Sequence, residues 1–223
     1  MAIRILCIET ALSQSSVALF EDDVCLHYCE SIAIGHTAEL VNTQIAEIMD
    51  KTGSDSSSWD AIAVSGGPGS YTGLRIGVST AKGICFARDL PLIHIDTTEI
   101  MVIAAKESVE NASFYLASID ARRNDIFYAL YDRNIQSVMP ISFTTIDEEL
   151  FANINIPSTI VIGSGASKVL MVYKNMQKSD SLVAAKNMGI VAKNKFLQGD
   201  YEDIAYYEPR YHKAFYTTYK PKS

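Results

Sequence analysis

The sequence predicts an α/β protein of two similar lobes, and three observations carry this prediction. Residues of alternating polarity form three successive strands near the N-terminus, and apolar residues at helical spacing follow them. The same order of strands and helices returns in the second half of the chain. The 223 residues are 48% hydrophobic and 20% charged, as in globular proteins that bury a sizeable core.

The first lobe is predicted to span residues 1–108. Period-2 alternation predicts three strands joined by short polar links. A change to 3.6-residue spacing after Gly35, ending at Gly53, then predicts a helix. The expected elements are strands at 3–9, 15–20 and 24–31, a helix at 37–51, a strand at 61–65, a helix at 72–87, a strand at 92–95 and a helix at 97–108.

The second lobe is predicted to span residues 109–223, and it repeats the order of the first. Ile8 and Glu9 have counterparts 111 positions later in Ile119 and Asp120. The expected elements are strands at 114–119, 125–132 and 137–143, a short helix at 145–151, a strand at 159–162, and helices within 165–172 and 182–197.

Three antiparallel strands followed by helix, strand and helix, twice over, predict two βββαβα lobes facing each other across a cleft. This is the architecture of the actin, hexokinase and Hsp70 group, which has the RNase H-like fold. Glu9 and Asp120 each end the first strand of a lobe, so we expect both carboxylates to point into the cleft.

The charge balance disfavours a free-standing nucleic-acid binder. Nineteen Lys and Arg against 26 Asp and Glu give a net charge of −7, which repels phosphate backbones and anionic lipids. We expect a cytoplasmic protein without a membrane segment, because no apolar run approaches the length of a spanning helix. The four cysteines lie in expected strands and a helix, and are therefore predicted to be reduced.

The glycine-rich run GGPGSYTGLRIG, residues 66–77, is the densest local signal. It lies between a strand and a helix, where free N–H groups and the helix dipole favour phosphate or carboxylate. It lacks the Lys-Ser/Thr of a Walker loop and has the wrong spacing for a dinucleotide fingerprint. A structural role, with Thr72 as N-cap and the glycines allowing close helix packing, is equally compatible with the pattern.

The remaining residues carry no recognised catalytic or metal-binding pattern. The four histidines offer no pair at metal spacing, and no serine lies in a Gly-x-Ser-x-Gly turn. Cys25, His27 and Cys29 share one face of an expected strand, but residues four apart in a strand lie about 13 Å apart, too far for one zinc ion. No metal site is predicted.

Motifs along nearly the whole chain resemble the TsaB (YeaZ) family. They are ILCIET at residues 5–10, His36-Thr37, the glycine run, PLI at 91–93, IDAR at 119–122 and EPRY at 208–211. The residues assigned to a candidate anion or nucleotide site are Gly67, Gly69, Ser70, Tyr71, Thr72, Gly73, Arg75, Glu9, His36, Asp120 and Arg122.

The resemblance implies an accessory subunit of the machinery that makes N6-threonylcarbamoyladenosine beside the tRNA anticodon. Such a subunit pairs with a TsaD-like catalytic subunit, works with a TsaE-like ATPase, and forms a homodimer when alone. The metal-binding His-x-x-x-His motif of TsaD falls at Thr97 and Met101, which are unsuitable ligands. We therefore expect no catalysis and no tightly bound cofactor, with ATP or ADP at most at the partner boundary and tRNA reached only through the complex.

The first two helices are predicted to form the partner surface. The stretch 73–87 is apolar or small nearly all round, and such a helix must be covered on two sides. Together with the 37–51 helix, it is expected to form a four-helix contact that buries about 800 Å² per side. The alternative, that each helix is buried within its own lobe, stays open, and the acidic Glu39 and Glu47 do not decide between the two. The residues assigned to this contact are Leu40, Val41, Ile45, Ile48, Leu74, Ile76, Gly77, Thr80 and Ile84.

Two other functions stay open at this point. The fold class also contains ATP-dependent phosphotransferases, in which Asp120 or Glu9 would be the base and the glycine run would hold phosphate. Sugar kinases of this fold carry an Asp-x-Gly turn after the first strand, whereas this chain has Glu9-Thr10-Ala11-Leu12. A metallopeptidase is the third hypothesis, and the missing histidine pair counts against it.

Overall fold

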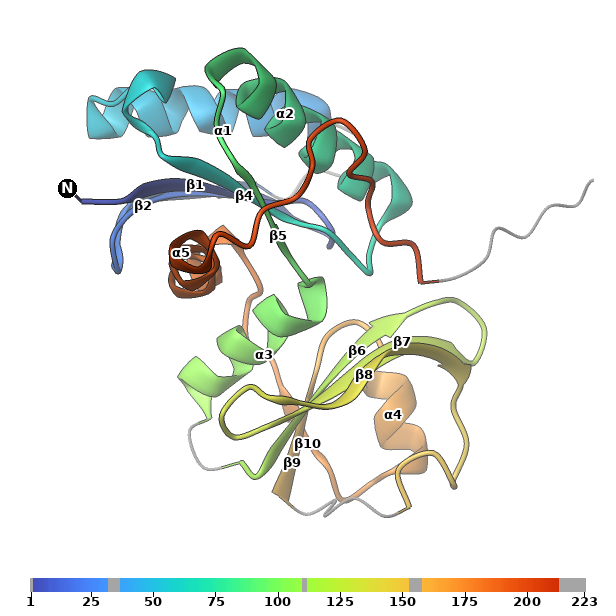
Figure 1. Ribbon diagram of the computed structural model, residues 1–223. Coiled ribbons are helices and arrows are strands. Elements are labelled where there is room, and N and C mark those ends of the chain that lie inside the picture. Colours follow the sequence, from blue (N-terminus) through green and yellow to red (C-terminus); the bar gives the residue numbers. More distant parts are fainter. Residues whose placement is uncertain (1, 32–36, 110–111, 153–157, 213–223) are drawn as a thin grey trace, which may run out of the picture.

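The computed structural model describes residues 2–31, 37–109, 112–152 and 158–212, and the first of its two five-stranded sheets is built from the N-terminal strands (Figure 1). Its strands are β1 (Arg4–Glu9), β2 (Ser15–Glu21), β3 (Val24–Ser31), β4 (Ala61–Ser65) and β5 (Leu92–Ile95), in the order β3-β2-β1-β4-β5. β1 pairs antiparallel with β2 and parallel with β4. The alternating segments pair as a meander, as the sequence predicts.

The second sheet repeats this topology. Its strands are β6 (Phe114–Asp120), β7 (Asp125–Asp132), β8 (Ser137–Thr145), β9 (Thr159–Ile162) and β10 (Gln177–Ser179), in the order β10-β9-β6-β7-β8. β6 takes the place of β1, because it pairs antiparallel with β7 and parallel with β9. The predicted duplication and the two-lobed α/β fold class are confirmed.

Helices cover both faces of each sheet (Figure 1). They are α1 (Thr37–Thr52), α2 (Tyr71–Arg88), α3 (Thr97–Ser108), α4 (Ala166–Val172) and α5 (Gly189–Gln198), with 3-10 turns at Ser56–Ser58 and Ala185–Asn187. α1 and α2 share a core with Leu6 and Ile8 on one face of the first sheet. Ile5 and Cys7 point to the opposite face, against Ala192 of α5. α3 and α4 pack on opposite faces of the second sheet.

Three expectations about the second half differ from the structure. The helix expected at 145–151 is wrong, because Asp147 accepts hydrogen bonds from the backbone of Glu149 and Leu150 and so closes a local turn. β10 was not expected at all. The helix expected over 182–197 is shorter, and it packs on the first sheet, whereas the division at residue 108 places it in the second lobe.

None of the helices in the described residues has the length and apolarity needed to span a bilayer. The four cysteines, Cys7, Cys25, Cys29 and Cys85, are unpaired.

The end of β1 lies directly against α2, and glycines make this approach possible. A Cβ atom added to Gly73 would lie 2.0 Å from the backbone oxygen of Thr10, and one added to Gly77 would lie 2.2 Å from its Oγ1. The Thr10 hydroxyl donates a hydrogen bond to the Gly73 carbonyl oxygen at 2.8 Å. Gly83, further along the same helix, has open space where a side chain would begin.

Adding one methyl group at these glycines tests the contact. We expect Gly73→Ala to lower the free energy of unfolding by about 1–3 kcal/mol, because the new Cβ overlaps fixed backbone. Gly83→Ala, the matched control, should raise it by about 0.5–1 kcal/mol, because alanine favours the helix and meets nothing. Urea unfolding measures both changes. Equal effects of the two variants would contradict the contact.

Candidate functional site

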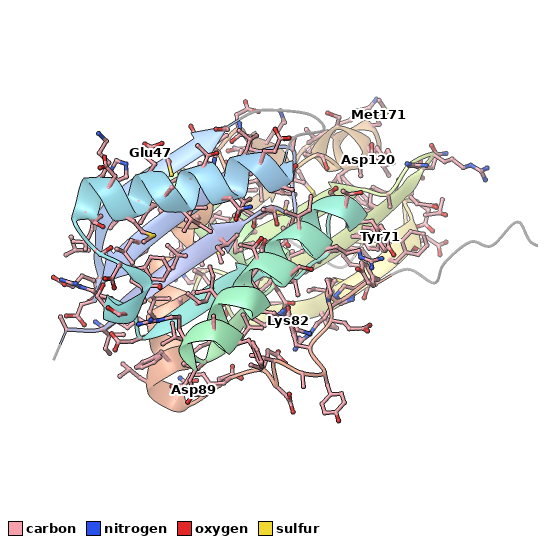
Figure 2. All side chains as sticks on the ribbon, turned by 90° about the horizontal axis from the view of Figure 1, so that it is seen from above. Glu47, Tyr71, Lys82, Asp89, Asp120 and Met171 are labelled. Atoms are coloured by element: carbon pink, nitrogen blue, oxygen red, sulfur yellow. The ribbon has the colours of Figure 1, made fainter. Side chains whose placement is uncertain are left out.

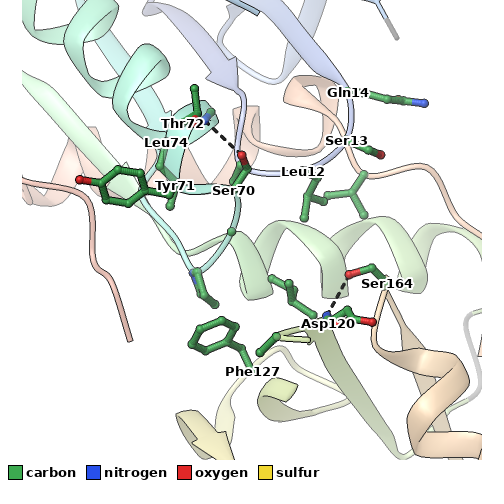
Figure 3. A pocket seen from close by; sticks show the side chains of 18 of the residues that line it. Leu12, Ser13, Gln14, Ser70, Tyr71, Thr72, Leu74, Asp120, Phe127 and Ser164 are labelled. Atoms are coloured by element: carbon green, nitrogen blue, oxygen red, sulfur yellow. Dashed lines mark hydrogen bonds between the residues drawn. The ribbon is translucent and has the colours of Figure 1, made fainter. Parts of the chain in front are cut away.

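A cavity of about 1420 Å³ opens between the two sheets (Figure 3). Residues 11–14, between β1 and β2, form one wall together with residues 68–74 at the start of α2. Asp120, Ala121, Arg122 and Phe127 of the β6–β7 hairpin form the opposite wall with Ser164. The rest of the lining comes from residues 181–183 and 210–212, and from Thr37, Ile76, Ile119 and Gly163.

The structure brings together seven of the eleven residues assigned to the anion site. The seven share a position on the cavity wall, and they are Gly69, Ser70, Tyr71, Thr72, Gly73, Asp120 and Arg122. Of the other four, Gly67, Glu9 and Arg75 are absent from the lining, and the assignment of Gly67 and Arg75 to an anion site stays a prediction. A Cβ atom on Gly67 would lie 2.6 Å from the Arg210 carbonyl oxygen. Arg75 donates a hydrogen bond to the Tyr71 hydroxyl at 2.6 Å. His36 lies outside the described residues.

The glycine run serves internal packing. A Cβ atom on Gly69 would lie 2.3 Å from the Ala11 carbonyl oxygen, which already accepts a hydrogen bond from the Ser70 N–H. α2 begins at Tyr71, one residue earlier than expected. Its N-cap is Ser70 and not Thr72, because the Ser70 side chain accepts a hydrogen bond from the Gly73 N–H at 3.2 Å (Figure 3). The structural interpretation of the run therefore holds at Gly69, Gly73 and Gly77.

Glu9 is buried and closes its own turn instead of reaching the cavity. Its side chain is 1% exposed, and Oε1 accepts hydrogen bonds from the N–H groups of Ala11 and Leu12 at 2.6 and 3.3 Å. Burial raises the pKa of the carboxyl to about 7, against the lowering effect of hydrogen bonds from Ser65, Ala11 and Leu12. The expectation that Glu9 points into the cleft is wrong, while Asp120 does line it.

Asp120 is held in an ion pair. Its Oδ1 lies 2.8 Å from Lys168 Nζ and also accepts the Arg122 N–H at 2.6 Å. The hydrogen bond from Lys168 lowers the pKa of this carboxyl, so it is a weak proton acceptor near neutral pH. This geometry disfavours Asp120 as the general base of a phosphotransferase.

The residues assigned to the partner surface divide into two groups. Val41, Ile48, Leu74 and Gly77 are buried in the core of the first lobe, so their assignment to an outer surface is wrong. These residues lie on the side of α1 and α2 that packs on the first sheet. The hydrophobicity of a residue does not by itself tell whether it faces the sheet or a partner. Half-buried residues make up the rest, and they are Leu40, Ile45, Ile76, Thr80 and Ile84.

The outer sides of α1 and α2 lie side by side, with no other described element above them (Figure 2). On α2, the exposed positions Thr72, Ser79, Gly83 and Ala87 follow helical spacing and carry no charge. Phe86, next to this stripe, is 82% exposed. This face is open and carries no charge from Ser79 to Ala87, whereas Arg75 is exposed between Thr72 and Ser79, and α1 exposes Glu39 and Glu47.

Several residues of the site were not assigned to it from the sequence, although Tyr211 belongs to the EPRY motif. Lys168, Ser164, Tyr211 and His212 reach the cavity or its acidic residue from distant segments. Among the described residues, no group of three His, Cys, Asp or Glu side chains is placed to hold a metal ion. Thr97 and Met101 are fully buried.

Comparison with known proteins gives the family. A family model described as "TsaD: tRNA N6-adenosine threonylcarbamoyltransferase" matches residues 31–206, which is most of the chain. The chain belongs to this family. Within it, the chain is similar to the tRNA threonylcarbamoyladenosine biosynthesis protein TsaB of Escherichia coli K12, with 34% identity over 131 residues. It is also similar to TsaB of Haemophilus influenzae, with 35% identity over 127 residues.

The match to these TsaB proteins is partial in length. The two alignments cover 59% and 57% of the chain, and 56% and 53% of the relatives, so the chain spans about half the length of the curated relatives it matches. YeaZ from Pseudomonas aeruginosa superposes over 94% of the chain and 99% of its own length, with a TM-score of 0.79 and 21% identity. The predicted TsaB (YeaZ) assignment is confirmed.

The wider fold class is also confirmed. The ADPNP-bound activator of 2-hydroxyisocaproyl-CoA dehydratase from Clostridium difficile covers 90% of the chain and 99% of its own length, with a TM-score of 0.52 and 10% identity. This likeness concerns the fold alone.

The buried carboxyl of this TsaB-family chain predicts a pH dependence of stability. Between pH 4.5 and 7 the folded state holds the Glu9 proton that the unfolded state has lost, so stability falls as pH rises through this window, by about 3 kcal/mol. Glu9→Gln keeps the Oε1 acceptor without the charge and should remove this loss. Urea unfolding at several pH values measures it. Glu208→Gln, at an exposed position, is the control and should leave the slope unchanged.

Proposed function

We propose that this chain is a non-catalytic subunit required for forming N6-threonylcarbamoyladenosine on tRNA. In this proposal it pairs with a TsaD-like catalytic subunit through the outer faces of α1 and α2. The observation that carries the proposal is membership of the TsaD family. The resemblance places the metal-binding histidines of TsaD at Thr97 and Met101, and this placement supports a non-catalytic role. The names of the TsaB relatives support the same pathway.

The local chemistry supports a non-catalytic role. Thr97 and Met101 are buried and have no strong metal-binding group. The two carboxylates available to a phosphotransferase are also engaged, because Glu9 closes a turn and Asp120 pairs with Lys168. A chain that has the fold of an enzyme, but lacks metal ligands and free carboxylates at these positions, functions by binding a partner.

The open face of α1 and α2 supports a helical partner. Its uncharged stripe of small residues lets another helix approach closely, and the inner sides of both helices are already packed on the first sheet. A TsaD-like subunit shares the family model and would present equivalent helices. In the absence of that subunit, a second copy of this chain would cover the face as a homodimer.

The remaining components act through the complex. A TsaE-like ATPase completes it, with ATP or ADP at the boundary between this chain and its partner. The net charge of −7 supports a path in which tRNA is bound by the assembled complex and not by this chain alone.

Reconstitution tests the proposed function. We expect the TsaD-like and TsaE-like subunits, supplied with threonylcarbamoyl-adenylate, ATP and tRNA, to form the modified nucleoside only when this chain is added. The chain alone should transfer nothing. Mass spectrometry of digested tRNA measures the product. Full modification without this chain would refute the proposal.

A charge in the middle of the open face tests the partner surface. Gly83→Arg should weaken association with the TsaD-like subunit at least tenfold, because a buried unpaired charge and a long side chain separate the helices. The monomer should stay folded, since nothing lies within 4 Å of the new Cβ.

Asn194→Arg is the matched control for this variant. Asn194 is an exposed residue of α5, on the opposite face of the same sheet. Titration calorimetry should show unchanged affinity for it. Equal affinity of both variants would place the contact elsewhere on the molecule.

A further inference from the structure

The segment after α5 crosses the first lobe and returns to the cavity. We call residues 199–212 the C-terminal strap (Figure 1). The strap first runs along the edge of the first sheet, where the Glu202 N–H donates to the Leu92 carbonyl at 2.9 Å. It then passes α2, where Lys82 Nζ donates to the Tyr207 carbonyl at 2.9 Å. It ends beside the glycine run, where the Arg210 N–H donates to the Gly66 carbonyl at 2.8 Å.

Tyr207 is the buried anchor of the strap. Its side chain is 6% exposed and packs in the core beneath α2, whereas its neighbour Tyr206 is 85% exposed. The Tyr207 hydroxyl lies 2.6 Å from His94 Nδ1, and His94 Nε2 lies 2.8 Å from Asp96 Oδ1. His94 is itself 5% exposed.

The direction of the hydrogen bond between His94 and Asp96 follows from the ionisation of Asp96. Burial by itself raises the pKa of this carboxyl, but the hydrogen bond and charge of His94, with the charges of Arg210 and His212, lower it overall. An ionised carboxylate only accepts, so His94 Nε2 donates to Asp96, and His94 Nδ1 shares the second hydrogen bond with the Tyr207 hydroxyl. The three residues form one continuous chain from the strap to the start of α3.

The strap supplies a shared wall of two cavities. Arg210 and His212 line the large cavity between the sheets and also a second one of about 410 Å³ beside Asp96, Glu99 and Tyr131. The Tyr211 ring lies 5.0 Å from the Tyr71 ring at the mouth of the large cavity.

We infer that the strap is a latch, fastened by the hydrogen bond between Tyr207 and His94, whose release opens both cavities without unfolding either sheet. Its end is joined to the glycine run by backbone contacts, so its position sets access to the start of α2. Gly66 packs closely against the hydrogen bond between Tyr207 and His94. A Cβ atom on Gly66 would lie 1.9 Å from His94 Nδ1 and 2.3 Å from the Tyr207 hydroxyl.

Hydrogen exchange of the full-length chain tests the latch. Tyr207→Phe keeps the buried ring and removes only the hydroxyl. We expect the exchange of the Glu202 and Arg210 amides to speed up about five- to tenfold, which is the contribution of one buried hydrogen bond. The amides of Leu6 and Leu116, in the centres of the two sheets, should exchange at the rate of the unmodified chain.

Two outcomes would overturn the inference. Unchanged exchange of the strap would show that Tyr207 does not fasten it, and equal acceleration of strap and sheets would show global unfolding. Lys82→Met, which removes a side-chain hydrogen bond to the strap from α2, should speed up the same amides. Tyr206→Phe, the neighbouring exposed tyrosine, is the matched control and should change nothing.

Discussion

The close contact between the end of β1 and the start of α2 is the constraint on which the rest of the structure depends. Thr10 donates to the Gly73 carbonyl, and the Ala11 carbonyl accepts the Ser70 N–H at 2.7 Å. No side chain of α2 separates the helix from this turn. One packing arrangement therefore sets both the inner wall of the cavity and the direction in which the outer face of α2 points.

This constraint changes the meaning of the glycine run. In a phosphate-binding loop, glycines let a ligand approach the backbone, whereas here Gly69 and Gly73 let the chain approach itself. Glu9 behaves in the same way, because its buried carboxyl closes its own turn. The polar groups at this end of the first lobe thus serve internal structure, and the proposed function rests on the outer face of α1 and α2.

The sequence predicts the fold well because strand and helix periodicities are strong over most of both lobes. It fails at 145–151, where Asp147 satisfies the backbone locally, and at α5, whose place on the first sheet depends on packing between distant segments. The site was predicted in part. Asp120 follows from the duplication and Arg122 from the IDAR motif. The hydrogen bond between Tyr207 and His94 joins residues 113 positions apart, and no local pattern indicates it.

The central claim is that this chain acts through the outer face of α1 and α2, and cross-linking from defined positions measures this most directly. A photoreactive residue in place of Ser79, exposed on α2, should cross-link to the TsaD-like subunit in the assembled complex. The same residue in place of Asn194 on α5 should not. A complex that assembles but cross-links from position 194 and not from 79 would contradict the account.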